Sequence, residues 1–181
     1  MKLFDWLGCP RRDEGKAALT QWRRSWTAAV ESQDDDPDRL RQQLGALEAP
    51  NLDLEVELEM LDALEQLREA QRAAAAGLLP VVETHHRVIG GDACHFTAPA
   101  SLPSDQNHAS GRLLLTSARA VFVGGGRTAA TAWHAVHDIA RIDRDVLLVR
   151  ADRSPAAHFR FNTYGDAVLC AFLAGRLRPA R

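Results

Sequence analysis

Cysteines and long apolar runs are scarce in this chain, and both scarcities narrow what the protein can be. The three cysteines, Cys9, Cys94 and Cys170, are widely spaced and form no pair with metal-ligand spacing. This pattern predicts reduced thiols in a cytoplasmic protein. Apolar runs such as residues 73–79 are far shorter than the ~20 residues that a membrane-spanning helix needs. The N-terminus also lacks the extended apolar segment of a secretory signal.

Lysine is equally rare, since Lys2 and Lys16 are the only two and arginine supplies every other base. Together with the abundant alanine, this usage is typical of a GC-rich bacterial genome. Residues 1–79 carry 10 Lys and Arg against 16 Asp and Glu, a net charge of −6. Residues 80–181 carry 12 Arg against 8 acids, a net charge of +4, and all seven histidines. Opposite charges predict either that the two parts dock on each other or that each has its own partner.

Apolar periodicity and helix-breaking residues predict a helical segment over residues 1–79. Residues 13–33 repeat apolar side chains at a helical spacing, and residues 37–47 begin with a proline suited to a first helical turn, with Asp36 available as N-cap. Trp22 and Trp26 lie one turn apart in the first helix. They predict either burial against the other helices or an interfacial contact with a membrane or a partner.

Residues 52–76 carry two conflicting signals. Residues 52–60 alternate apolar and acidic side chains, as a strand does, yet Leu, Glu and Met favour a helix and Val56 is the only β-branched residue there. We predict a long helix that ends at Gly77. Its interleaved acids are typical of a solvated helix face. Its wide apolar face predicts a second contact, with the β-domain or with another copy of the chain.

Residues 80–181 predict a β-domain with a terminal helix. The expected fold class is α+β, an antiparallel β-barrel or sandwich of about seven strands capped by a C-terminal helix that begins after Thr163. Gly90–Asp92 and Gly124–Gly126 each predict a hairpin turn, and the latter lacks the Lys-Ser/Thr of a phosphate loop. The seven strand-like runs are residues 81–89, 93–98, 112–115, 120–123, 130–142, 146–151 and 158–161.

One spacing within this β-domain resembles a known family. The pattern Gly111-x-Leu113-x-x-Thr116-x-x-Arg119-x-x-Phe122 is similar to the core of GRAM and bacterial pleckstrin-homology-like domains. Ile139 and the terminal helix also stand where that family has them, so the resemblance covers about residues 80–178. It implies two nearly orthogonal antiparallel sheets closed by a C-terminal helix. It also implies a module that binds membranes, phosphoinositides or proteins and is not an enzyme.

The same positions have a physical interpretation. Gly111 permits a bend where the strand begins, residues 116–119 make a turn, and Phe122 fills the barrel. Arg119 has two interpretations. Its guanidinium either bonds loop carbonyls or an acid such as Asp138, or it contacts a headgroup or a phosphopeptide.

Histidines and a cysteine gather in a way that suggests a metal site, the alternative function. Pairing of the expected first hairpin would bring His85 or His86 near His95, beside Cys94, which gives two ligands where a structural zinc needs four. His134 and His137 would point to opposite faces of a regular strand. We therefore expect no metal and no cofactor, and keep a small metal-dependent hydrolase using residues 85–95 as the alternative.

The expected function is that of a non-enzymatic binding or adaptor module. Its candidate binding residues are Arg112, Arg119 and Arg127, which would engage a protein segment or an anionic, lipid-like membrane surface. No catalytic set has the required spacing. No nucleic-acid partner is expected, because the aromatic residues lie in apolar surroundings typical of a core. The helix over 52–76 would mediate self-association.

Overall fold

The computed structural model describes residues 10–32, 37–47, 53–84, 86–105 and 109–179. They group into two compact units, residues 1–65 and residues 66–181. The division falls inside a helix, earlier in the chain than the expected boundary between residues 79 and 80. The Asp36 N-cap lies outside the described residues. No helix in the described ranges has the length and apolar character needed to cross a membrane.

The first unit contains α1 (Pro10–Glu31), α2 (Pro37–Ala46) and the first half of α3 (Glu55–Ala75). Its core is built around two tryptophans of α1, which are almost completely buried. The indole of Trp22 donates to the carbonyl of Leu40 at 2.9 Å, and that of Trp26 donates to the carbonyl of Met60 at 2.5 Å. Both tryptophans therefore fasten α1 to its neighbouring helices, as the burial alternative predicts.

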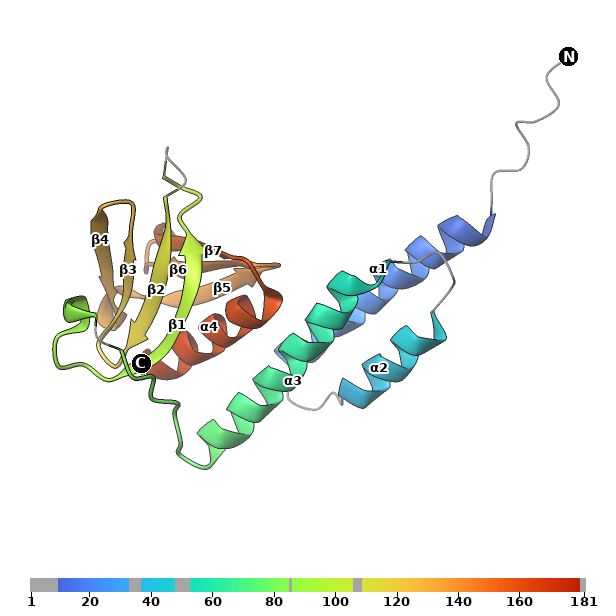
Figure 1. Cartoon of the computed structure of the whole chain (residues 1–181), viewed down its shortest axis with the longest axis horizontal. Coiled ribbons are helices and arrows are strands. Elements are labelled where there is room, and N and C mark those ends of the chain that lie inside the picture. Colours follow the sequence, from blue (N-terminus) through green and yellow to red (C-terminus); the bar gives the residue numbers. More distant parts are fainter. Residues whose placement is uncertain (1–9, 33–36, 48–52, 85, 106–108, 180–181) are drawn as a thin grey trace, which may run out of the picture. The chain divides into compact units, whose positions relative to one another are not determined.

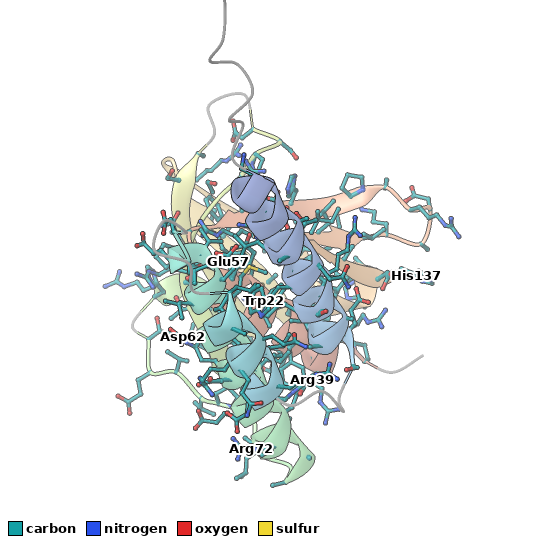
Figure 2. The ribbon with its side chains drawn as sticks, turned by 90° about the vertical axis from the view of Figure 1, so that its right-hand side faces the viewer. Trp22, Arg39, Glu57, Asp62, Arg72 and His137 are labelled. Carbon is teal, nitrogen blue, oxygen red and sulfur yellow. The ribbon has the colours of Figure 1, made fainter. Side chains whose placement is uncertain are left out.

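An acidic side chain also lies inside this helical unit. Glu57 of α3 is fully buried, and its Oε1 accepts from Arg23 Nε of α1 at 2.7 Å. Figure 2 shows Glu57 and Trp22 among the side chains of these helices. The expectation that the acids of residues 52–69 form a solvated face is therefore wrong for Glu57, because an arginine from another helix pairs with it. Sequence spacing along one helix does not reveal such a partner.

The ambiguous segment is a helix, as predicted. α3 ends in a Schellman motif, in which the N–H of Leu78 bonds the carbonyl of Ala73 at 2.9 Å and that of Gly77 bonds Ala74 at 3.0 Å. Gly77 has φ +78°, in the left-handed region that the motif requires. The helix propensities of Leu, Glu and Met therefore outweigh the alternating pattern.

The second unit is built on one seven-stranded antiparallel sheet, which confirms the α+β class (Figure 1). The order of strands is β4-β3-β2-β1-β7-β6-β5, and the sheet is not closed into a barrel. The strands are β1 (Cys94–Ser101), β2 (Ser110–Thr116), β3 (Arg119–Gly124), β4 (Arg127–Ala132), β5 (Asp138–Ile142), β6 (Asp145–Val149) and β7 (Pro155–Phe161).

The sheet folds over on itself around an apolar core. Only two residue pairs join β1 to β7, so β1–β4 and β5–β7 form two halves linked at one corner. Phe122 of β3 and Phe159 of β7 stack with ring centroids 6.4 Å apart, which places the inner faces of the halves against each other. α4 (Tyr164–Leu177) adds Ala167, Cys170 and Leu173 to this core.

The terminal helix begins as the sequence predicts. Thr163 is its N-cap, and its hydroxyl accepts from the backbone N–H of Asp166 at 3.1 Å. The buried side of α4 packs on the core that the folded sheet encloses. The helix therefore covers one side of that core, as the fold class requires.

Two predicted strands are wrong. Residues 81–84 are irregular, and residues 87–89 form a short 3₁₀ helix, so the described residues of this run form no hairpin with β1. Residues 130–142 are divided between β4 and β5 by a second 3₁₀ helix, Trp133–Ala135. The strand total agrees with the prediction because one strand is lost and another is gained.

Candidate functional site

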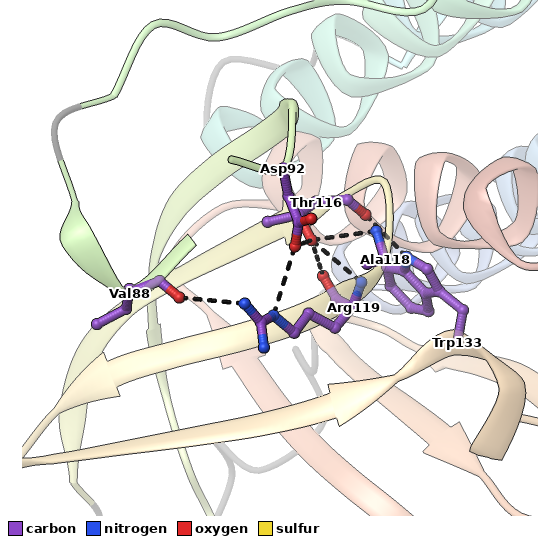
Figure 3. A network of polar contacts seen from close by, with 6 residues as sticks. All are labelled: Val88, Asp92, Thr116, Ala118, Arg119 and Trp133. Atoms are coloured by element: carbon purple, nitrogen blue, oxygen red, sulfur yellow. Dashed lines mark hydrogen bonds and ion pairs between the residues drawn. The ribbon is translucent and has the colours of Figure 1, made fainter. Parts of the chain in front are cut away.

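The turn between β2 and β3 centres on Thr116, whose side chain is fully buried (Figure 3). Its hydroxyl oxygen accepts from the N–H of Arg119 at 3.1 Å and from that of Ala118 at 3.3 Å. It also lies within donating distance of the Arg119 carbonyl, at 3.0 Å, and of an Asp92 carboxylate oxygen, at 3.3 Å. The Trp133 indole donates to the Thr116 carbonyl at 2.8 Å. Thr116 thus fixes the turn and ties it to two other segments.

Arg119 points away from that turn toward the segment before β1. Its Nε lies 3.5 Å from Asp92 Oδ2, an ion-pair distance, and its Nη2 reaches the carbonyl of Val88 at 3.5 Å. The guanidinium therefore meets a loop carbonyl and an acid. The prediction that this acid is Asp138 is wrong, because Asp138 begins β5 in the other half of the sheet.

Arg112 lies on the outer face of the sheet, the face that Arg119 shares by alternation along β3. It is exposed on β2, and its Nη1 donates to Thr97 Oγ1 of β1 at 3.3 Å. Its neighbours Leu113 and Leu115 point into the core that the folded sheet encloses. Since side chains alternate along a strand, Arg112 faces outward.

Arg127 stands at the start of β4, just after the Gly125–Gly126 turn. Both glycines have positive φ, +59° and +74°, which confirms a tight hairpin there. The guanidinium pairs with Asp105 in the loop between β1 and β2. The Arg127 side chain is 51% exposed while that of Asp105 is 13% exposed. The arginine therefore remains accessible even though a nearly buried carboxylate holds it.

A cavity of about 630 Å³ opens beside Arg127, on the inner side of β4. We call it the open-side cavity, since the sheet is not closed there. Small side chains form much of its lining, and charged or polar ones line it with them. Its lining residues are Leu102, Ser104, Asp105, Phe122, Arg127, Ala129–Ala132, Ala135, Arg150, Ala156, Ala157, His158 and Phe159.

Charge at this cavity is mainly basic. Arg127 and Arg150 both line it, and Asp105 is the acid between β1 and β2 that offsets one of them. Arg150 Nη1 donates to the carbonyl of Pro155 at 3.1 Å and remains exposed. An anionic group entering the cavity would meet two guanidinium groups, which bind carboxylates and phosphates with paired hydrogen bonds.

His158, which lines the cavity, lies next to a partly buried acid. Its Nε2 lies 3.3 Å from Asp145 Oδ1, in an orientation that makes no hydrogen bond. Both oxygens of Asp145 accept from Arg160, at 2.9 and 2.7 Å. These hydrogen bonds hold the pKa of the Asp145 carboxyl below its ordinary value of 3.8, although partial burial opposes the shift. Asp145 therefore stays ionised at neutral pH, beside a histidine that lines the cavity.

A serine, a histidine and an aspartate meet here, but not as a catalytic triad. Ser104 Oγ lies 3.4 Å from His158 Nδ1, at the long limit of a hydrogen bond. In a triad the acid bonds Nδ1 and the serine faces Nε2, whereas here the roles of the two nitrogens are reversed. Arg160 also occupies the Asp145 oxygens that a triad acid would offer to the imidazole. The arrangement has polar character without the geometry of a general base.

The predicted histidine and cysteine set is dispersed. Cys94 is buried, its thiol lies 3.3 Å from the carbonyl of Phe96, and burial raises the pKa of the thiol. His95 Nδ1 lies 2.7 Å from the carbonyl of Pro80, and His86 is exposed ahead of the first 3₁₀ helix. His134 and His137 lie outside any strand. Among the residues that the structure describes, which exclude His85, no three potential ligands approach closely enough to hold a metal.

A second cavity, of about 490 Å³, has a different character. It lies within residues 66–181 and is lined mainly by apolar side chains, with Gln66, Glu69, His95 and Thr97 as its polar members. None of the three candidate arginines lies on it. Of these two cavities, the open-side cavity is therefore the one that a candidate arginine lines.

Of the three arginines that the sequence indicates, only Arg127 lines the open-side cavity. Sequence reasoning missed Asp105, Arg150 and His158, which come from three separate segments. The sequence offered only one weak sign of Arg150 as a site residue. Arg150 lies just before the Asp152–Pro155 turn, and Arg127 lies just after the glycine turn, so both arginines stand next to turns. Recognising that both turns open onto one cavity requires the folding of the sheet.

Comparison with known proteins leaves this site without a template. No protein-family model matches the chain, and no curated protein matches it. The resemblance to GRAM and pleckstrin-homology-like domains therefore stays a prediction.

Proposed function

We propose that residues 66–181 form a non-enzymatic binding module whose ligand is an anionic segment of a partner protein, held in the open-side cavity. The observation that carries the proposal is the convergence of Arg127, Arg150 and His158 on one alanine-walled hollow. Apolar walls with a few convergent polar groups are typical of ligand sites. The predicted pleckstrin-homology-like character of the domain agrees with such a role.

An acidic side chain of the ligand would bind Arg127 by displacing the carboxylate of Asp105. Asp105 occupies Arg127 in the free protein, and an incoming carboxylate takes its place. Because the ion pair forms before the ligand arrives, binding gains less than a full new ion pair. Specificity then depends on how well the ligand fills the alanine-lined walls and reaches Arg150.

The positions of the basic side chains favour a protein segment over an anionic membrane surface as the ligand. A flat charged surface needs basic side chains on one exposed face. Arg112 faces outward from β2, Arg119 meets Asp92, and Arg127 stands at a recessed cavity. A recess of this size suits a side chain of a protein ligand.

Enzymatic alternatives receive no comparable support. The metal-dependent hydrolase would need residues 85–95 to converge, and the described members of that set lie apart. The serine at the cavity faces the wrong imidazole nitrogen at a long distance. We therefore assign the cavity to binding.

The helical part is proposed to mediate self-association. On α3, Val56 is 37% exposed and Leu58 is 55% exposed, although the helix buries Met60 and Leu61. Val56 and Leu58 lie on different sides of the helix, so the proposal rests on Leu58, the more exposed of the two. We expect sedimentation to give a dimer or higher oligomer, and Leu58→Glu to give a monomer. A strict monomer of the unsubstituted chain would contradict self-association and leave the cavity proposal intact.

A cytoplasmic location is proposed from the cysteines. Cys94 and Cys170 are buried free thiols, which is typical of a reducing compartment. Fractionation of the native host, with the chain detected by an antibody, tests this location.

The function is tested by selecting peptides on the full-length chain from a random displayed library, then measuring their affinity by fluorescence anisotropy. Arg127→Gln and Arg150→Gln should each weaken the selected peptides about tenfold, since each removes a charged hydrogen bond. Arg112→Gln is the matched control and should leave affinity unchanged. Vesicles with and without anionic lipid are assayed in parallel. Binding to anionic vesicles alone, or equal loss with all three variants, would refute the proposal.

A further inference from the structure

β4 is an edge strand with an unprotected side. It pairs with β3 along one side, and among the described strands nothing pairs with the other. Natural edge strands are usually protected by charged side chains, proline, a bulge or a covering segment. β4 has the sequence Arg-Thr-Ala-Ala-Thr-Ala, and its pairing with β3 runs without a register shift. Only Arg127, at its first position, carries a charge.

The hairpin geometry shows which backbone groups face the open side. The two-residue glycine turn makes Gly124 and Arg127 a hydrogen-bonded pair. Hydrogen-bonded and non-hydrogen-bonded pairs alternate in an antiparallel ladder, so Phe122–Ala129 is also bonded and Val121–Ala130 is not. Ala130 and its neighbour two residues before, Thr128, therefore direct N–H and C=O groups away from β3.

Side-chain alternation places the cavity beside that edge. Ala129 pairs with buried Phe122 and shares its inner face, together with Arg127 and Thr131. All three line the open-side cavity, which Ala156 of β7 also borders. An extended chain along β4 would thus bond the edge with its backbone and send every second side chain into the cavity.

We propose that the ligand is an extended segment of a partner protein that adds a strand to β4 and places an acidic side chain against Arg127 and Arg150. This inference rests on the proposed function and specifies the form of its ligand. Unpaired N–H and C=O groups accept a strand and offer nothing specific to a helix, whose own groups are paired. The small walls of Ala129 and Ala156 leave room for a large apolar side chain two residues from the acid.

The charge of the cavity and the unpaired backbone groups of β4 both favour an extended acidic segment over a helix. The two arginines that line the cavity complement a carboxylate, and Asp105 already marks a position where one pairs with Arg127. The Thr128 and Ala130 backbone groups complement the backbone of an extended chain. A folded helix would satisfy the charge but not the edge.

The test uses the peptides selected on the full-length chain. Each is synthesised as a series with one backbone nitrogen methylated at a time, which removes one donor and leaves the side chains. Strand addition predicts that affinity falls tenfold or more at every second position and changes less than threefold at those between. On the protein, Ala130→Pro removes one outward N–H and should weaken binding about tenfold, while Ala130→Val keeps it and should not.

The outcomes separate this inference from the function on which it rests. Loss of binding with Arg127→Gln but no alternation in the methylation series would overturn strand addition and leave the cavity as the site. Selected peptides without acidic residues would overturn the charge assignment. If no peptide binds, both proposals fall. Thermal melting checks that Ala130→Pro still folds, and the methylated peptides give an answer that does not depend on that variant.

Discussion

Thr116→Val tests the turn network directly. The substitution keeps the branched shape of a fully buried side chain and removes a hydroxyl that accepts from two backbone N–H groups and lies 3.0 Å from the Arg119 carbonyl. Each of these hydrogen bonds contributes about 0.5–1.5 kcal/mol net. Because Ala118 is exposed, water can replace one of them. We expect a loss of about 2–3 kcal/mol, or about 30- to 150-fold in the folding equilibrium.

Urea unfolding of the full chain, followed by the amide NMR signals of β2 and β3, measures this loss in the β-unit itself. Thr116→Ser is the matched control, because it keeps the hydroxyl and removes one buried methyl group, at a cost of about 1 kcal/mol. Valine should therefore cost more than serine. The argument fails if Thr116→Val unfolds within about 0.5 kcal/mol of the unsubstituted chain, or if serine is the more damaging change.

Other perturbations give equally definite expectations. Trp26→Phe removes an indole hydrogen bond and some buried volume, so circular dichroism should show the helices destabilised by about 1–2 kcal/mol. The folded pKa of Asp145 is lowered by Arg160, so the stability it adds is present above pH 3.8 and lost as pH falls through the folded pKa. Asp145→Asn should thus lower stability at neutral pH, with the difference from the unsubstituted chain shrinking at low pH in urea titrations. Burial raises the pKa of Cys94 and of Cys170, so both thiols should resist iodoacetamide until urea unfolds the chain, as peptide mass spectrometry would show.

Local sequence signals predicted most of the elements. The helix at 52–76 followed from residue propensities and its glycine end, and the glycine hairpin followed from three adjacent glycines. Thr163 marked the start of the terminal helix. Each of these features is decided by neighbours within a few positions, which is why periodicity and turn chemistry suffice.

Features that depend on distant partners were not predictable in the same way. Gly111 was expected to permit a bend, yet the structure shows a close approach of strands there. A Cβ on Gly111 would lie 2.3 Å from the Val123 carbonyl oxygen and 2.6 Å from Gly124 Cα. The described residues of the strand-like run at 81–89 form an irregular segment and a 3₁₀ helix, although their composition resembles that of a strand. Val82, Val88 and Ile89 bury apolar surface against Leu114, and the N–H of Val82 donates to the carbonyl of Cys94 at 2.8 Å, so the segment packs on the sheet without becoming a strand.

The candidate site could be predicted only in part, for the same reason. The sequence indicated Arg127 from an exposed turn, but not Arg150 or His158, since these converge only when the sheet folds over. For Arg119 the sequence left two interpretations, a contact with carbonyls or an acid and a contact with a ligand. The structure shows contacts of the first kind, with Asp92 and the carbonyl of Val88, although the acid is not the one expected.

The central claim is that the open-side cavity holds the ligand. An NMR titration of the ¹⁵N-labelled full-length chain with the tightest selected peptide tests it most directly. The account predicts that amide shifts centre on β4, on Arg150 and on His158, with Arg112 unaffected. Shifts centred on the outer face of β2 or on the helices of the first unit would contradict it.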